Sequence, residues 1–299
     1  MKTKGQLCNL CGGDDFKLVK ETLRDAKEKF KVYGCCDCGH IQILPRPTPQ
    51  EDKEFYDVNA QDKARGKDID YHKLYENNLF DTTRHLHLIE ELDIDKSSRF
   101  LDIGSGYGFF VAELYNSGYK DVTGLEISEQ RRRIAAEHSP VEMIDPDIND
   151  PDVDIGRFDV VTLFHVLEHM AEPIKFVERI VNLLNPGSIF ICEVPNANEL
   201  LLETCNAYND FYWIRAHLNY FNEKSLLACF KQAGMKNVQT KYQQRYGLIN
   251  LSNWLTFGKP QIDKPVFTID KPYLEVEEFY KKDLEDKGRS DALIAIAKV

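Results

Sequence analysis

Two features of the chain could together hold a small-molecule cofactor, a glycine-rich turn and a later carboxylate. In LDIGSGYGFF, Gly104, Gly106 and Gly108 follow an apolar run and precede a helix-length stretch. Glycine lets the backbone approach a ligand closely, and free N–H groups at a helix start favour polar or anionic atoms. Glu126 ends the next apolar run, where it could accept hydrogen bonds from two ribose hydroxyls. The pattern predicts a nucleotide-like cofactor, and the alternative is a purely structural tight turn.

The turn is shorter than the one that binds a pyrophosphate. A dinucleotide fingerprint has the spacing G-x-G-x-x-G/A, whereas Gly108 comes one residue early here. Asp102, just before the turn, could bind an amino-acid ammonium group directly or through water. A cofactor without a pyrophosphate is therefore favoured over a dinucleotide-dependent oxidoreductase or epimerase.

Paired cysteines near the start of the chain could bind a metal ion. Cys8-x-x-Cys11 and Cys35-x-x-Cys38 place two pairs in turns that can converge on one tetrahedral ion. Four thiolates leave no open coordination position, so we expect a structural Zn²⁺ that stabilises the fold of a small zinc ribbon. The alternative is a set of free thiols in a disordered tail.

The net charge and the apolar runs of the chain limit the classes of partner that we expect it to bind. The 299 residues carry a formal net charge of −11, and the pI is about 5.3. An acidic surface repels nucleic acid and anionic lipid, so we expect neither a nucleic-acid nor a membrane partner. Because the chain has no apolar run of membrane-spanning or signal-peptide length, we expect a cytoplasmic location.

Short apolar runs alternate with helix-length segments from Arg99 to about residue 196. This alternation predicts parallel strands with right-handed crossovers, the α/β doubly wound class. A later helix is expected from Asn222, a good N-cap, to Gly234, with a strand near Val238 and a closing strand LIAIAKV. Apolar spacing over residues 74–92 predicts amphipathic helices.

The ordered motifs resemble those of class I S-adenosylmethionine (SAM)-dependent methyltransferases. LDIGSGYG is similar to the first motif of that family, FDVVTLFHVLEHMAEP to its fourth-strand segment and NPGSIFICEVPN to its fifth-strand motif. The resemblance implies a Rossmann-like seven-stranded sheet with a reversed final strand, and SAM as cofactor. In VEMIDPDIND, Asp147 and Ile148 are aligned with the adenine contacts, and Asp145 is the competing alignment. The implied SAM-site residues are Asp102, Gly104, Ser105, Gly106, Tyr107, Glu126, Ile127, Asp147, Ile148, Phe164 and His165.

Three domains are expected along the chain. They are a zinc-ribbon module over residues 1–46, a helical linker or lid over 47–96 and the methyltransferase domain over 97–299. The PRPTP run is a stiff connector that marks the first boundary. Residues 244–290 form a long insertion before the last strand, and such insertions are often functional.

Candidate catalytic residues follow the fourth strand. A helical arrangement of HVLEH would put His165, Glu168 and His169 on one face. His169 is the preferred general base, because histidine titrates near neutrality, and the alternative is a role in solvating a helix N-terminus. His165 could instead serve packing or the cofactor, and Glu168 could be a structural hydrogen-bond partner. His217 falls where the family builds its acceptor pocket, near several aromatic residues, Tyr208, Phe211, Tyr212, Trp213 and Tyr220.

Basic residues offer a weaker signal. The run Arg131-Arg132-Arg133 is interpreted as a solvated helix face. Better candidates for binding phosphate are Arg84, Arg215, Lys241 and Arg245, although no spacing forces them together.

The cysteine pairs followed by this core resemble bacterial enzymes that methylate sugars and surface glycans. The resemblance implies methylation of a small molecule, with a hydroxyl of a nucleotide sugar or surface-glycan precursor as first choice. A sugar C-methyltransferase or a natural-product methyltransferase is the alternative, and a homodimer is possible. A non-catalytic zinc-ribbon adaptor with a degenerate SAM-like fold is the alternative from another class.

Overall fold

A mixed seven-stranded sheet forms the centre of the computed structural model, which describes residues 5–58, 70–150, 152–260 and 273–299. The strand order is β10-β11-β8-β7-β4-β5-β6. Neighbouring strands are parallel, except that β11 runs antiparallel to β8 and β10. The predicted doubly wound sheet with a reversed final strand is confirmed. The strands are β4 (Phe100–Ile103), β5 (Val122–Leu125), β6 (Glu142–Ile144), β7 (Phe158–Phe164), β8 (Leu184–Pro195), β10 (Val238–Gln243) and β11 (Ala292–Lys298).

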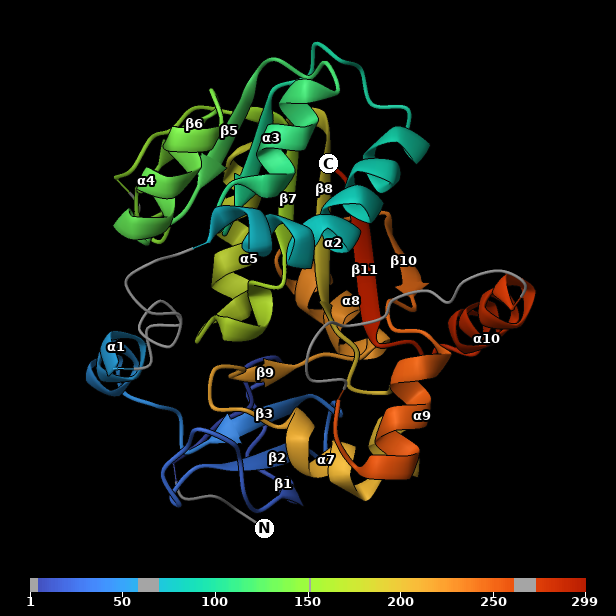
Figure 1. The fold of residues 1–299 in the computed structure, drawn as a ribbon. Helices are drawn as coiled ribbons and strands as arrows, with labels where there is room; N and C mark the ends of the chain where they lie inside the picture. The colour runs from blue at the N-terminus through green and yellow to red at the C-terminus, as the bar shows by residue number, and fades with distance from the viewer. Residues whose placement is uncertain (1–4, 59–69, 151, 261–272) are drawn as a thin grey trace.

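Helices cover both faces of this sheet (Figure 1). Successive strand residues point to opposite faces, so Val160 packs in one apolar cluster and Val161 in the other. The Val160 face is covered by α2 and α3, with α4 beside β6, and the Val161 face by α5 and α8. The helices are α2 (Tyr71–Glu91), α3 (Phe109–Asn116), α4 (Glu129–His138), α5 (Pro173–Asn182) and α8 (Glu223–Gln232).

The predicted helix boundaries at Asn222 and Gly234 are confirmed. The Asn222 side chain accepts a hydrogen bond from the Ser225 N–H at 3.0 Å, which satisfies a free donor of the first turn of α8. Gly234 has a φ of +86°, a left-handed conformation that ends the helix. The amphipathic helices predicted over residues 74–92 are one long helix in the structure, α2.

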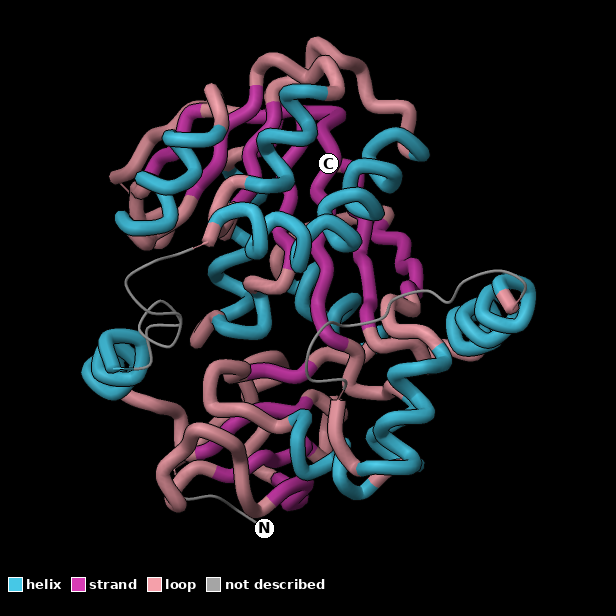
Figure 2. Tube along the Cα trace, in the orientation of Figure 1, coloured by secondary structure: helices cyan, strands magenta, loops and turns pink. Residues whose placement is uncertain are grey.

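The N-terminal segment forms a second, smaller sheet with the order β1-β2-β3-β9. It lies beyond the edge of the large sheet at which β8 ends (Figure 1, Figure 2). The last strand was not expected from the sequence, because Asn219 and Tyr220 come from the methyltransferase part of the chain. Its strands are β1 (Phe16–Lys20), β2 (Lys31–Cys35), β3 (Ile41–Leu44) and β9 (Asn219–Tyr220).

Several further helices surround the two sheets. The described parts of the predicted insertion, residues 244–260 and 273–290, contain α9 and α10, and its residues 261–272 lie outside the described residues. Helix α9 packs against α7 through Trp254 and Tyr208, whose rings lie 4.9 Å apart. In the described part of the chain, we find no helix long and apolar enough to cross a membrane. These elements are α1 (Pro49–Val58), η1 (Leu167–His169), α6 (Leu200–Thr204), α7 (Asn206–Tyr212), α9 (Leu248–Phe257) and α10 (Leu274–Asp286).

Candidate active site and metal centre

The glycine-rich turn joins β4 to α3, as predicted, and two of its glycines have different roles. Gly104 has a φ of +80°, and a Cβ there would lie 2.4 Å from Val166, so this glycine permits close packing of the segment after β7. Gly106 has a φ of +58°, and a Cβ there would meet no atom within 4 Å. The loop therefore presents bare backbone to open space at Gly106, as a ligand-binding turn requires.

Glu126 lies beside this loop, directly after β5. Its Oε2 accepts a hydrogen bond from the Gly106 N–H at 2.9 Å, and its Oε1 accepts one from the Ser128 N–H at 2.8 Å. The carboxylate is buried, and Nη1 of Arg131 lies 3.7 Å from Oε2. Glu126 thus fixes the glycine loop, while two carboxylate oxygens with about four lone-pair positions leave room for further donors.

The arginine run on α4 is not simply the solvated helix face that the sequence suggested, because one of its arginines makes structural contacts. Arg132 donates to the Glu126 carbonyl oxygen at 2.7 Å and pairs with Asp145 at 2.6 Å. This arginine anchors the end of β5 to the segment after β6. Asp145, the competing candidate for the adenine contact, is therefore held in an ion pair.

The other predicted cofactor residues differ in exposure. Ile127 is 81% exposed at the end of β5, whereas Tyr107 and Ile148 are buried. Asp147 is exposed, and its Oδ1 accepts hydrogen bonds from Asn149. Ile127 is consequently the apolar side chain of this group most available to a flat ring.

Phe164 and Ser105 make local contacts at the ends of their segments. Phe164, at the end of β7, stacks on His85 with ring centroids 3.7 Å apart. Ser105 donates its hydroxyl to the Asp102 carbonyl oxygen at 2.7 Å. Both residues thus lie at the edge of the sheet where the glycine turn begins.

Asp102 is a buried acid in the middle of the sheet. Its Oδ1 accepts a hydrogen bond from the Thr162 hydroxyl at 2.7 Å. Burial raises the pKa of Asp102 to about 7, although the hydrogen bond from the Thr162 hydroxyl opposes this rise. A nearby cation would lower that pKa again, so the site suits a positively charged ammonium group.

A buried ion network at the end of β8 centres on Glu193, which is not among the predicted site residues. Both its oxygens accept hydrogen bonds from the Arg84 guanidinium at 2.5 Å. Nε2 of His165 lies 2.8 Å from Oε1, and Nε2 of His85 lies 3.3 Å from Oε2. Arg245 completes the group, with Nη1 3.1 Å from the His165 ring. A lone acid inside the apolar run SIFICEV is the signal that could have identified it, because a buried carboxylate needs a cationic partner.

His165, Glu168 and His169 converge, but not through the predicted helical face. His165 has a φ of +56° and precedes the short 3₁₀ helix η1. Oε1 of Glu168 lies 3.5 Å from Nδ1 of His165 and 4.0 Å from Nε2 of His169. Burial opposes ionisation of Glu168, but His165, His169 and His217 outweigh it and lower its pKa to about 2.

A row of aromatic rings leads away from this cluster. The rings of His169 and His217 lie 5.0 Å apart, and Tyr220 follows at 5.9 Å from His217. Tyr212 lies 5.7 Å from Tyr220 and 6.0 Å from Tyr208. The hydroxyl oxygen of Tyr212 is buried without a hydrogen-bond partner.

The four candidates for phosphate binding each pair with a carboxylate. Arg84 pairs with Glu193, Arg215 with Asp52, Lys241 with Glu91 and Arg245 with Asp291. Arg84 and Arg245 do come together, since both also lie within ion-pair distance of Asp81, but carboxylates already neutralise them.

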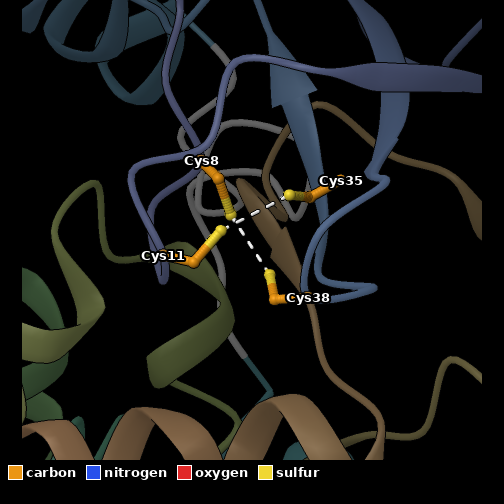
Figure 3. Close-up of side chains that lie close together, drawn as sticks. All are labelled: Cys8, Cys11, Cys35 and Cys38. Carbon is orange, nitrogen blue, oxygen red and sulfur yellow. Dashed lines mark hydrogen bonds between the residues drawn. The ribbon is translucent and has the colours of Figure 1, made fainter.

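The cysteine pairs converge at one point of the N-terminal sheet (Figure 3). The four sulfurs lie within 4.8 Å of one another, and the pairs Cys8–Cys38 and Cys11–Cys35 are each 3.5 Å apart. A tetrahedral Zn²⁺ site with Zn–S bonds of about 2.3 Å has S···S edges of about 3.8 Å. The donor set and its spacing therefore fit a zinc ion.

Comparison with known proteins agrees with this arrangement. A family model described as "Methyltransferase domain" matches residues 75–240, more than half of the chain. A SAM-dependent methyltransferase from Archaeoglobus fulgidus superposes with a TM-score of 0.52 and 18% identity, covering 77% of this chain and all of that one. A possible histamine N-methyltransferase from Thermotoga maritima gives a TM-score of 0.51 at 15% identity, over 81% of this chain and 97% of that one. The chain is an enzyme of the methyltransferase domain family, with the class I SAM-dependent fold.

Curated relatives match the central part of the chain. The ubiquinone biosynthesis O-methyltransferase of Coxiella burnetii is 28% identical over 118 residues, which are 38% of this chain and 50% of the relative. The enzyme of the same name from Roseobacter denitrificans is 26% identical over 157 residues, 49% of this chain and 63% of the relative. The chain thus spans about half the length of the first of these relatives.

Proposed function

We propose that this methyltransferase methylates a hydroxyl of a small polyhydroxylated molecule, specifically a nucleotide sugar or surface-glycan precursor. The observation that supports this proposal is a set of buried polar atoms without hydrogen-bond partners. These atoms are both oxygens of Glu168, Nδ1 of His217 and Oη of Tyr212. Leaving a buried polar group unpaired costs about 1–3 kcal/mol. An acceptor with several hydroxyl groups would satisfy these atoms and recover that cost.

SAM is the methyl donor in this proposal, and it supplies an electrophilic methyl group. We assign its site to the open backbone at Gly106, the Glu126 carboxylate and buried Asp102. Glu126 would accept the ribose hydroxyls, and Asp102 would face the ammonium group. The remaining predicted contacts, Gly104, Ser105, Tyr107, Ile127, Asp147, Ile148, Phe164 and His165, stay proposals of the same kind.

His169 is the proposed general base when no metal ion is bound at Glu168, His169 and His217. Its Nδ1 lies 2.8 Å from the Ala216 carbonyl oxygen, so Nδ1 carries the proton and Nε2 keeps its lone pair. Nε2 would take the hydroxyl proton as the acceptor oxygen gains the methyl group. His165 has a carboxylate near each ring nitrogen and is proposed as a positioning residue, whereas His217 would orient the acceptor.

The four cysteines are proposed to bind a structural Zn²⁺. Their thiolates would fill a tetrahedral shell, which leaves no position for a substrate. The ion would stabilise the small sheet that β9 shares with the N-terminal segment.

A phenolic hydroxyl is the second candidate acceptor, because the matching relatives are named ubiquinone biosynthesis O-methyltransferases. A panel of nucleotide sugars and phenols separates the two, with formation of S-adenosylhomocysteine as the readout. We expect turnover with nucleotide sugars. Turnover with phenols alone would refute the sugar assignment, and failure to bind SAM in calorimetry would refute the catalytic one in favour of an adaptor.

A further inference from the structure

A second group of metal-ligating side chains lies at the carboxyl edge of the large sheet. Glu168, His169 and His217 offer one oxygen and two ring nitrogens that all lie within 4.8 Å of one another. Glu168 and His169 come from η1, and His217 comes from the segment before β9. Tertiary folding therefore brings three ligands together from separate parts of the chain.

Glu168 is the strongest sign that this group has a missing partner. Its side chain is 1% exposed, and neither carboxylate oxygen has a hydrogen-bond partner. Nδ1 of His165 lies 3.5 Å from Oε1 and Nε2 of His169 lies 4.0 Å from it, and both distances exceed that of a well-formed hydrogen bond. Because His165 also pairs with Glu193 through Nε2, one imidazole serves two buried carboxylates, and a bound cation would stabilise Glu168 further.

One of the two histidines, His169, is arranged as metal ligands usually are. The Nδ1 of His169 faces the Ala216 carbonyl oxygen at 2.8 Å, which fixes the tautomer and leaves Nε2 directed toward Glu168. Metal-ligating histidines typically donate their second ring N–H to such an outer partner. Nδ1 of His217 is buried and has no hydrogen-bond partner, so its lone pair or proton is also unmatched.

We propose that Glu168, His169 and His217 form a binding site for one divalent first-row transition-metal ion. Two imidazoles and one carboxylate favour Zn²⁺, Mn²⁺ or Fe²⁺ over Mg²⁺ and Ca²⁺, which prefer oxygen ligands. Metal–ligand bonds of about 2.1 Å place donors about 3.0–3.4 Å apart, so binding would draw these side chains slightly closer. Three protein ligands leave open positions, unlike the four-cysteine site.

The role of the ion rests on the proposed function. An open position would take the acceptor hydroxyl oxygen and lower its pKa, as Lewis-acidic metals do. The hydroxyl proton would pass to water, and the oxygen would then accept the methyl group of SAM, which leaves as S-adenosylhomocysteine. His169 would then be a ligand and not a general base, because both roles use the lone pair of Nε2. A ligand is needed for metal affinity in the absence of any acceptor, whereas a base affects turnover alone, so binding measurements separate the two roles.

Mn²⁺ is the probe that tests this site. Thiolates select softer ions, so Mn²⁺ will not compete well for the cysteine site. The full chain, freed of loosely bound metal with EDTA and checked for zinc by mass spectrometry, is titrated with Mn²⁺ while electron paramagnetic resonance measures the free ion. We expect one bound Mn²⁺ per chain. No saturable binding of either Mn²⁺ or added Zn²⁺ beyond the cysteine site would overturn the proposal.

Isosteric and truncating variants locate the ion. Glu168→Gln and His217→Ala should each weaken Mn²⁺ binding at least tenfold, since loss of even an outer-shell partner costs 10–100-fold in affinity. Glu137→Gln and His72→Ala alter exposed residues of the same types and should bind as the wild type does. Circular dichroism and SAM affinity check that Glu168→Gln stays folded; a folded variant with wild-type Mn²⁺ affinity would also overturn the proposal. Mn²⁺ binding without SAM binding would refute the proposed function alone, and SAM binding without Mn²⁺ binding would refute the metal site alone.

Discussion

Replacement of Asp102 by asparagine should make the stability of the protein less dependent on pH. Asp102 is buried in the sheet, and burial raises its pKa to about 7 in the folded state. In the unfolded chain its pKa is close to 3.9. The asparagine side chain would keep the shape and the acceptor for the Thr162 hydroxyl but would not titrate.

The sign and the size of the effect follow from these two pKa values. The folded state holds a proton on Asp102 that the unfolded state has released, so stability falls as pH rises from about 4 to about 7 and is level above that. The full loss at high pH is about 4 kcal/mol, at about 1.4 kcal/mol per pH unit. Between pH 6 and pH 8.5 the expected loss is about 1.4 kcal/mol, a tenfold change in the unfolding equilibrium.

Urea unfolding without SAM measures this difference. The wild type should lose about 1.4 kcal/mol relative to Asp102→Asn between pH 6 and pH 8.5, a range that avoids the pI of about 5.3. Asp159→Asn is the control of opposite sign, because a hydrogen bond from the Arg99 N–H lowers the pKa of Asp159. A lowered pKa adds stability that is lost only in acid, so this control should stay parallel to the wild type above pH 6. Parallel profiles for Asp102→Asn and the wild type would refute the assignment of a raised pKa to Asp102.

Three other outcomes are expected. Glu126→Gln should weaken SAM binding about 10-fold to 100-fold in calorimetry, since a charged acceptor is lost, and unchanged affinity would remove Glu126 from the site. Arg84→Met should lower the free energy of unfolding by about 1.5–3 kcal/mol, because Glu193 loses its bidentate partner and keeps only His165 and His85. The double variant with Glu193→Leu should recover most of that loss, and no recovery would contradict the pairing. In protein treated with EDTA to remove loosely bound metal, Cys38→Ser should reduce the zinc content from one ion per chain and lower the melting temperature, whereas Cys36→Ser, at an exposed cysteine outside the cluster, should do neither.

The central sheet could be predicted because its information is local. Each apolar run, such as that around Phe158–Phe164, is bounded by a helix-length segment, and a right-handed crossover leaves few ways to join them. Gly106 and Glu126 were predictable for the same reason, since each directly follows a strand of a parallel sheet. Their carboxyl ends share one edge, so the two residues meet without any long-range information.

The histidine cluster could be predicted only in part, and the strand β9 not at all. The HVLEH run identifies His165, Glu168 and His169, but a helical spacing does not foresee the left-handed His165 or the 3₁₀ turn that follows it. His217 and β9 come from a distant segment, and a two-residue strand has too little pattern to be recognised. Their positions depend on tertiary pairing with β3, and no local propensity specifies that pairing.

Through Asn219 of β9, which pairs with β3, the N-terminal module is hydrogen-bonded to the segment that carries the proposed active site. The Asn219 amide nitrogen donates to the Met170 carbonyl oxygen at 2.7 Å, directly after η1. Its Oδ1 accepts from Asn9 at 2.8 Å and lies 3.0 Å from Nε2 of His40, both in the module. One buried amide therefore ties the cysteine-bearing sheet to the segment that carries Glu168 and His169. Because Asn219 bonds to both segments, we expect the module to help position Glu168 and His169 in addition to folding around its own cysteine site.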